Sequence, residues 1–158
     1  MLVQFKFNNF KCFKDEVTLN LVASNYFKDE PTNIYPTENY SIVNSLAIYG
    51  ANASGKSNVQ EAFRYMAMYV INSLDYGDES DGKKKKSKFF RPTPFLFDST
   101  SANAESSFEV YFTLPGDKTE KTYNYGFCID KEGVTEEWLN VKAKTARKFS
   151  TVFYRGDD

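Results

Sequence analysis

The sequence contains no histidine, and it has only two cysteines, Cys12 and Cys128, in 158 residues. The absence of histidine excludes histidine-activated nucleophiles and argues against the usual zinc sites and pH switches. The two thiols are enough for one disulfide, but neither has a second ligand nearby at metal-site spacing. Both lie on strand-like segments and are more simply interpreted as small apolar fillers. Zinc chemistry and histidine-activated thiol chemistry are therefore not expected.

Long apolar runs and a strong charge of one sign are also missing. No stretch reaches the length of a membrane span, and the amino-terminal residues alternate between apolar and polar types instead of forming a signal-peptide core. Twenty basic and 21 acidic residues give a net charge of -1, so the chain as a whole is not a polycation that seeks nucleic acid. We expect a soluble, cytoplasmic protein without a membrane partner.

Aromatic residues, by contrast, are abundant: they make up 17% of the chain and favour half-buried strands. Apolar and polar residues alternate in 2–10 and 16–24, which predicts a hairpin. The same alternation predicts an antiparallel meander from the segments 107–115, 121–130, 134–143 and 150–155. Residues 25–40 are rich in Asn, Pro, Asp, Glu and Thr and are expected to form a surface loop.

The middle of the chain changes from strand to helix periodicity. Residues 46–50 are continuously apolar, which predicts a short strand buried on both faces. From Lys56 onward, apolar residues recur at steps of three and four and predict one apolar helical face, made of Val59, Ala62, Phe63, Met66, Val70 and Leu74. The helix should fade in 75–82, and 77–88 should be a flexible charged loop. We expect residues 1–158 to form a single domain.

Residues 50–57 lie between this strand and this helix and match the phosphate-loop pattern G-x-x-x-x-G-K-[ST]. The two glycines permit the backbone angles and the close approach that let main-chain N–H groups surround a phosphate, at the positive end of the helix. Lys56 is the predicted catalytic residue, reaching the β- and γ-phosphates, and the Ser57 hydroxyl is the predicted Mg²⁺ ligand. The predicted nucleotide-binding residues of the loop are Gly50, Ala51, Asn52, Ala53, Ser54, Gly55, Lys56, Ser57 and Asn58.

Hydrolysis needs a further acidic group, and the sequence offers no convincing one. Asp130 ends an apolar strand but opens a turn with Gly133, so a turn residue is the better interpretation. Asp98 follows a shorter segment with two prolines, and we assign neither as a catalytic carboxylate. No Asn-Lys-x-Asp motif occurs, which argues against GTP specificity of the small-GTPase kind.

The hairpin segment 3–13, the strand 17–19 and the loop 49–58 resemble the start of an ABC-class ATPase head, as in the SMC and RecF proteins. The likeness extends to bacterial AAA-type proteins of the RloA and abortive-infection kind, related to the OLD family, through segments 94–98, 125–130 and 137–139. The resemblance implies an α/β P-loop NTPase fold. In it, the chain would be the amino-terminal lobe of the head, with a P-loop strand and helix plus an antiparallel β meander.

The resemblance also implies partners and roles. It implies Asn52 beside the γ-phosphate, Asn58 after the Mg²⁺-holding serine, and Lys11 or Lys14 near the base or sugar. It implies an ATP-sandwiched homodimer of complete heads, an effector protein, and a role in phage defence or DNA processing. The chain has no signature motif, Walker B pair or switch histidine, so we expect a fragment that binds ATP and hydrolyses it weakly or not at all.

Two other interpretations remain open. One is an ATP-responsive binding module that changes its partner contacts without turnover. The other is a nucleic-acid-binding piece that uses Lys83 to Lys88 against a DNA or RNA backbone. A solvated lysine run is the simpler explanation of that segment, because acidic residues precede it.

Overall fold

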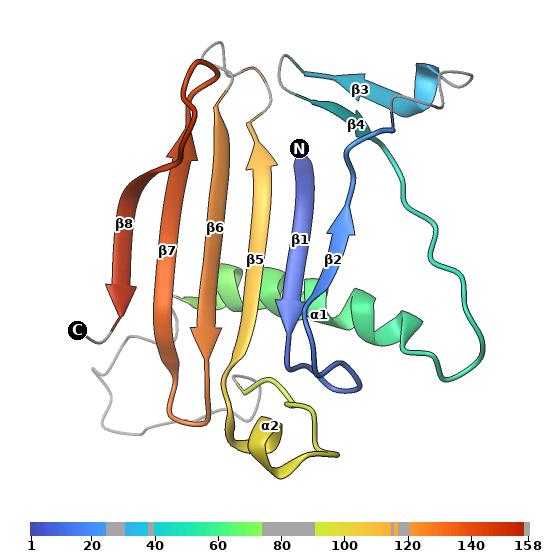
Figure 1. Ribbon diagram of the computed structural model, residues 1–158, viewed down its shortest axis with the longest axis vertical. Coiled ribbons are helices and arrows are strands. Elements are labelled where there is room, and N and C mark those ends of the chain that lie inside the picture. The colour runs from blue at the N-terminus through green and yellow to red at the C-terminus, as the bar shows by residue number, and fades with distance from the viewer. Residues whose placement is uncertain (25–30, 38–39, 74–90, 115, 117–120, 157–158) are drawn as a thin grey trace.

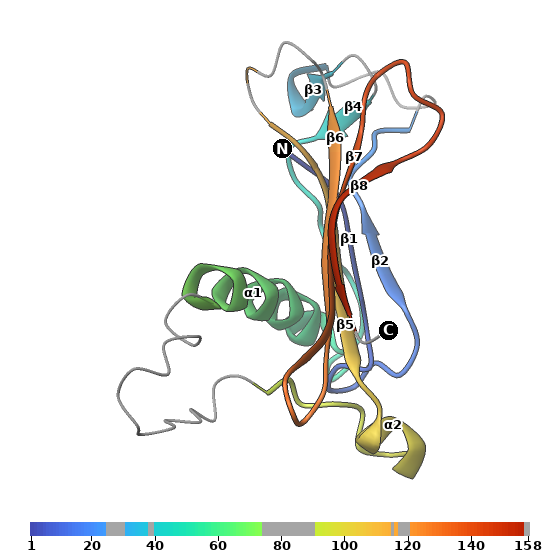
Figure 2. The same cartoon turned by 90° about the vertical axis from the view of Figure 1, so that its left-hand side faces the viewer.

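The computed structural model describes residues 1–24, 31–37, 40–73, 91–114, 116 and 121–156. They form a mixed α/β fold in which a six-stranded antiparallel sheet, ordered β2-β1-β5-β6-β7-β8, has one long helix, α1, across one face (Figures 1 and 2). The sheet strands are β1 (Leu2–Asn8), β2 (Val17–Asn20), β5 (Ser106–Thr113), β6 (Thr122–Ile129), β7 (Val134–Lys142) and β8 (Ser150–Gly156). The other elements are η1 (Pro31–Asn33), β3 (Ile34–Pro36), β4 (Ser41–Val43), α1 (Lys56–Asn72) and α2 (Ser99–Asn103).

The strands predicted from period-two alternation are confirmed. β1 and β2 form the expected antiparallel hairpin, and β5 to β8 follow one another as the expected meander. The other long edge of β1 pairs with β5, with Phe7 opposite Phe108. This pairing places the first strand of the chain inside the sheet and not at its edge.

The hydrophobic core fills the space between α1 and the sheet. Four phenylalanines from the sheet, Phe5, Phe7, Phe108 and Phe127, are completely or almost completely buried, and α1 adds Val59, Ala62 and Met66. The rings of Tyr65 and Tyr69 on α1 lie 4.9 Å from Phe108 and 4.7 Å from Phe127, centroid to centroid. Burying each phenylalanine contributes roughly 1.5–3 kcal/mol, so this layer fixes α1 on the sheet.

The helix and its predicted apolar face are confirmed: Val59, Ala62 and Met66 are buried against the sheet, and the Phe63 ring meets the Phe5 ring edge to face at 5.2 Å. Phe63 and Val70 are 41% and 43% exposed, and Ile71 is 73% exposed. Phe63 and Val70 therefore lie at the margin of this face and are only partly covered, whereas Ile71 lies about 100° around the helix from Val70 and outside the predicted face. Leu74 and the predicted charged loop 77–88 lie outside the described residues.

The prediction of a buried strand at residues 46–50 is wrong. This segment is not a strand, and Leu46, Ile48 and Tyr49 are 46%, 43% and 90% exposed. A strand buried on both faces needs neighbours on both sides, and every strand pair among the described residues is antiparallel and formed by other segments. The expected P-loop strand is therefore extended chain that exposes its apolar side chains.

The predicted surface loop at 25–40 is only partly correct. Ile34–Pro36 pairs with Ser41–Val43 as a small two-stranded sheet, β3 and β4, and Ile42 is fully buried. The sequence signal was weak because both strands are three residues long and one contains Pro36.

In the described part of the chain, no helix lies across the face of the sheet opposite α1 (Figure 2), and this face carries a row of hydrogen-bonded polar side chains from β5, β6 and β7. Asn124 is 5% exposed and donates to Glu109 at 2.8 Å, while its Oδ1 accepts from Asn140 at 3.0 Å. Beside this ladder, the Trp138 ring lies over Gly126, so that a Cβ at Gly126 would be 2.3 Å from Trp138 Cζ2. The Trp138 ring can occupy this position because residue 126 is a glycine and has no side chain.

Both cysteines are free thiols, so no disulfide links them. Cys128 is buried on β6, which agrees with the filler interpretation, whereas Cys12 is exposed and does not fit it. None of the described helices is long and apolar enough to cross a membrane.

Candidate phosphate-binding site

The phosphate-loop residues 50–57 form a tight, exposed loop that leads directly into α1. Ala53 and Gly55 have left-handed backbone angles, with φ of 63° and 94°, and Ser54 N donates to Ala51 O at 3.3 Å. A Cβ on Gly50 would lie 2.7 Å from Ser54 Oγ. The two glycines therefore stand where the sequence predicted that side chains would interfere with the loop.

Lys56 folds back over this loop. Its Nζ donates to Gly50 O at 2.8 Å and to Ala51 O at 2.6 Å. An ammonium group has three N–H donors, so one donor stays directed away from these two carbonyls. The charge is thereby fixed above the loop backbone without filling its capacity to bind an anion.

The start of α1 adds main-chain donors beside this charge. Asn58 N and Val59 N donate to Gly55 O, so the hydrogen bonds of the helix that begins at Lys56 are first donated by residues 58 and 59. The first N–H groups of a helix lack partners within the helix and favour an anion there. The Ser57 side chain is exposed at this helix start. The nine loop residues predicted to bind nucleotide thus lie together around one helix terminus.

The β1–β2 turn packs against the back of the loop. Asn58 Nδ2 donates to Cys12 Sγ at 3.0 Å, and a Cβ on Gly55 would be 2.7 Å from Cys12 Sγ and 2.8 Å from Phe13 Cζ. Sequence spacing could not reveal this contact, because the turn and the loop are more than 40 residues apart in the chain. The turn packs so closely on Gly55 that a larger residue at position 55 would collide with Cys12 and Phe13.

Lys11 was predicted to approach the base or sugar of a nucleotide. In the structure its ammonium pairs with Glu61 on the second turn of α1 and lies 5.7 Å from the centre of the Phe10 ring. Glu61 was not singled out by the sequence, although its place five residues after Lys56 put it on the same helix. This pairing directs Lys11 to the helix and not to the loop.

Asn9 holds the turn in place. It is 5% exposed, has a φ of 46°, and its Nδ2 donates to Ser101 O, Ala104 O and Glu105 O at 2.8, 3.1 and 3.0 Å. Its Oδ1 accepts from Phe95 N at 3.0 Å. One buried amide therefore ties the turn behind the phosphate loop to the segment 95–105.

Cys12 gives a direct chemical test of this packing. We expect N-ethylmaleimide to modify Cys12 in the native protein and to leave Cys128 unmodified, because burial, and then Glu105 and Glu136, raise the pKa of the Cys128 thiol to about 12. Peptide mass spectrometry after a timed reaction would measure this. Equal modification of both thiols under native conditions would contradict the described burial of β6.

The two carboxylates that the sequence left unassigned have structural roles. Asp98 caps α2, accepting from Ser101 N at 3.2 Å and Ser101 Oγ at 2.6 Å, and pairs with Lys14 at 3.2 Å. The Ser101 hydroxyl, and then Lys14, hold the pKa of the Asp98 carboxyl well below its usual range. Asp130 Oδ1 accepts from Glu132 N and Gly133 N at 2.7 and 3.1 Å, which confirms the turn interpretation.

Metal sites in proteins are built from sets of ligand side chains. Among the described residues, no group of three or more His, Cys, Asp and Glu side chains is placed to hold a metal ion. Mg²⁺ held through the Ser57 hydroxyl would take further ligands from the phosphates and water.

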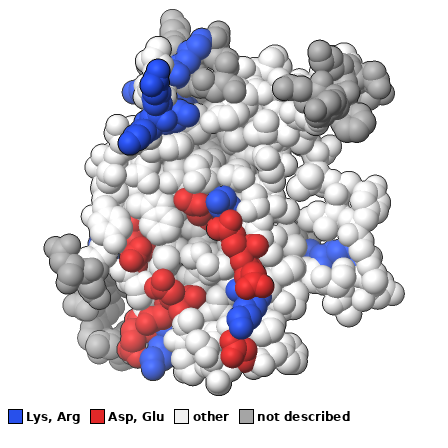
Figure 3. Space-filling view, in the orientation of Figure 1, with Lys and Arg blue, Asp and Glu red and all other residues white. Residues whose placement is uncertain are grey.

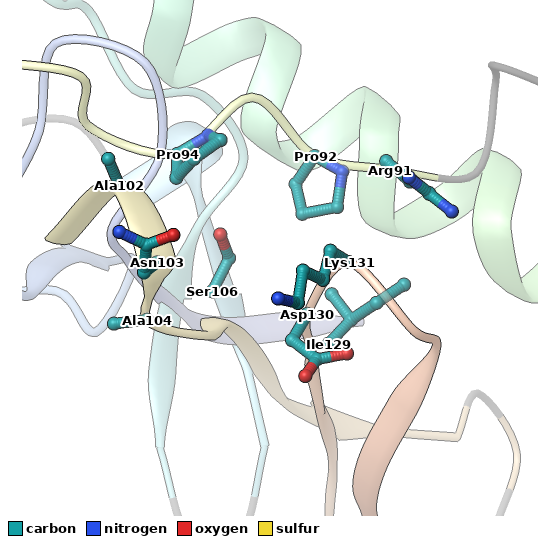
Figure 4. Close-up of a pocket in the computed structure, with 10 residues that line it drawn as sticks. All are labelled: Arg91, Pro92, Pro94, Ala102, Asn103, Ala104, Ser106, Ile129, Asp130 and Lys131. Carbon is teal, nitrogen blue, oxygen red and sulfur yellow. The ribbon is translucent and has the colours of Figure 1, made fainter.

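A separate cavity of about 180 Å³ lies between the segment 91–94, the end of α2 and the turn after β6 (Figure 4). Its walls are mainly apolar, with Pro92, Pro94 and Ile129 among them, and none of the residues 50–58 lines it. The candidate site is thus the exposed loop and not this cavity.

Comparison with known families places these features in context. Residues 45–158 match the family described as "AAA domain, putative AbiEii toxin, Type IV TA system". No curated protein matches the chain. The matched region contains the whole phosphate loop, α1 and the strands from β5 to β8. The chain belongs to this AAA-domain family, whose members are nucleotide-binding, ATPase-like proteins.

Proposed function

We propose that the chain binds Mg²⁺-ATP through residues 50–58 as one lobe of an ABC-class ATPase head. The observation that carries this proposal is the position of Lys56, whose ammonium is held over the loop by Gly50 O and Ala51 O with one donor left. The β- and γ-phosphates would accept from that donor and from the main-chain N–H groups at the start of α1. Ser57 would place its hydroxyl on Mg²⁺.

Lys11 has a secondary part in this proposal. To contact the base or sugar, the Lys11 ammonium would have to leave its ion pair with Glu61 and bind the nucleotide instead. An exposed ion pair contributes about 0–1 kcal/mol, so this exchange costs little and gains little. We therefore assign the affinity to the loop and not to Lys11.

The exposed apolar side chains support a second lobe in the complete head. Leu46, Ile48 and Tyr49 before the loop, and Ile71 on α1, are exposed apolar side chains. A parallel strand added beside 46–50 would convert this segment into the buried strand that the sequence predicted. In the proposal, that lobe also brings the acidic residue that positions the attacking water, and two heads close around ATP.

Without that residue we propose binding with little or no turnover. Asp98 and Asp130, the carboxylates nearest to the expected pattern, are already held as a helix cap and a turn. This favours, as a second candidate, a lobe that responds to ATP by changing its contacts. The biological setting in the proposal, phage defence or a toxin–antitoxin system with an effector partner, is supported by the family match alone.

Isothermal titration calorimetry with Mg²⁺-ATP tests the proposal. We expect saturable heat for the wild-type chain and a loss of affinity of roughly 10- to 100-fold for Lys56→Ala, because charge-assisted hydrogen bonds contribute about 1.5–3 kcal/mol each. Lys131→Ala, which removes an exposed lysine outside the loop, serves as the matched control and should bind like wild type.

A phosphate-release assay on the same proteins separates binding from hydrolysis. We expect release near the background rate for all three. No heat with the folded wild-type chain would overturn the proposed function, and rapid release that depends on Lys56 would overturn only the prediction of weak hydrolysis.

A further inference from the structure

The loop between β7 and β8 gathers positive charge that the nucleotide site does not use. From Trp138 to Gly156 the sequence has no Asp or Glu and five basic residues, Lys142, Lys144, Arg147, Lys148 and Arg155. Arg155 pairs with Glu137 at 2.8 Å, and the other four basic residues lie in the segment 142–148, which we call the basic loop. For a chain with a net charge of -1, this is a strong local excess.

The basic loop is presented by ordered structure. Ala146 N donates to Ala143 O at 3.0 Å and closes a turn inside the loop. At its base, Lys142 Nζ lies 5.9 Å from the centre of the Phe149 ring, and this ring meets the Tyr111 ring edge to face at 5.9 Å. Arg147 and Lys148 are exposed, and neither has an ion-pair partner within the described residues.

The basic loop differs in charge from the open face of the sheet beside it. In Figure 3, Lys and Arg side chains gather at one upper corner of the molecule, while Asp and Glu side chains gather lower on the open sheet face. Glu109 on β5 and Glu136 on β7 belong to that open face, with side chains on the same side as Asn124. A polyanion would be attracted to the loop and repelled from the middle of the sheet.

We propose that the basic loop binds the phosphate backbone of a nucleic acid without sequence preference. Exposed cations in water hold a single small anion weakly, because solvent and salt screen each pair. A nucleic acid presents a regular row of phosphates, so several weak contacts add up and release counterions. Arg147 offers a planar fork for two phosphate oxygens, and Thr145 and Ser150 supply hydroxyl donors nearby.

The composition of the loop favours nucleic acid over a membrane surface. The apolar residues within 142–148 are Ala143 and Ala146, and neither can insert into lipid as a large side chain would. The basic loop also lies at the end of the sheet opposite to the start of α1 (Figure 1), so binding there leaves the phosphate loop open. The proposal is therefore independent of the proposed ATP site.

Fluorescence anisotropy tests it with a short labelled DNA strand and its duplex, titrated with the full chain between about 50 and about 200 mM salt. We expect binding whose logarithmic salt slope is about -3 to -4 for the duplex, as neutralising up to four phosphates requires. The Arg147→Glu/Lys148→Glu variant should lose at least about tenfold in affinity, with a slope shallower by about 2.

Charge-matched controls make the result specific to this loop. Arg91→Glu/Lys131→Glu makes the same change in net charge at two exposed residues beside the turn between β6 and β7, and should change affinity less than about twofold. Thermal unfolding would show that each variant is folded. The inference is overturned by no binding at low salt, by equal losses in both double variants, by loss only when the lysines of 83–88 are replaced by glutamine, or by tighter binding to phosphatidylserine vesicles than to DNA.

Discussion

The Asn9→Asp variant should lose roughly 3–5 kcal/mol of folding free energy at neutral pH, although the two side chains have nearly the same shape. Asn9 is almost fully buried, and the two N–H donors of its amide are shared among three main-chain carbonyls. Aspartate would place a second carboxylate oxygen against these three acceptors. The charge would lose its hydration on burial, and the carbonyls would lose their donor.

Urea unfolding followed by circular dichroism would measure this loss. Asn103→Asp is the matched control, because Asn103 is exposed and its amide donates to a single carbonyl, Ser99 O, at 2.9 Å. That change should cost less than about 1 kcal/mol. Similar losses at both positions would show that the buried amide does not anchor the turn.

The Gly126→Ala variant should lose roughly 2–3 kcal/mol, because one added methyl group has no room. The new Cβ would lie 2.3 Å from Trp138 Cζ2 and 2.9 Å from the main-chain oxygen of Phe108. The ring belongs to the residue paired directly across from Gly126 on β7, so it cannot move away without leaving the sheet face. On the β5 side, the main-chain oxygen of Phe108 blocks movement of the added methyl group.

A double-mutant cycle identifies the cause. In a Trp138→Ala background, Gly126→Ala should cost clearly less than in the wild type, leaving only the contact with Phe108 O. Gly116→Ala is a control with open space around the glycine, where the φ of 74° alone should cost about 1 kcal/mol. An unchanged cost of Gly126→Ala in both backgrounds would exclude the tryptophan as its cause.

The sequence patterns correctly predicted the features that depend on residues close together in the chain. Alternation in β1, β5 and β6 identified the buried faces, because Phe5, Phe108 and Phe127 all lie on the side that α1 covers. The phosphate-loop pattern predicted where α1 begins, since the loop and helix are continuous in the chain. The turn role of Asp130 followed from its spacing to Gly133, which is also local.

Long-range contacts could not be predicted in this way. The pairing of Lys11 with Glu61, the packing of Cys12 on Gly55 and the closure of Trp138 over Gly126 depend on how separate segments meet. The error at 46–50 has a related cause. An apolar run indicates that a segment seeks burial, but it does not indicate whether a neighbouring strand is present to provide it.

Because β1 lies inside the sheet, the region matched by the family does not coincide with the part of the chain that folds together. The family match begins at residue 45, yet Phe5 and Phe7 from β1 are among the most deeply buried side chains of the core. A polypeptide trimmed to the matched region would leave β5 with a bare edge and Phe108 without its cross-strand partner, Phe7. The boundary of the family match therefore falls inside one cooperative folding unit. The first two strands, although they lie outside the match, belong to the structure that supports the phosphate loop.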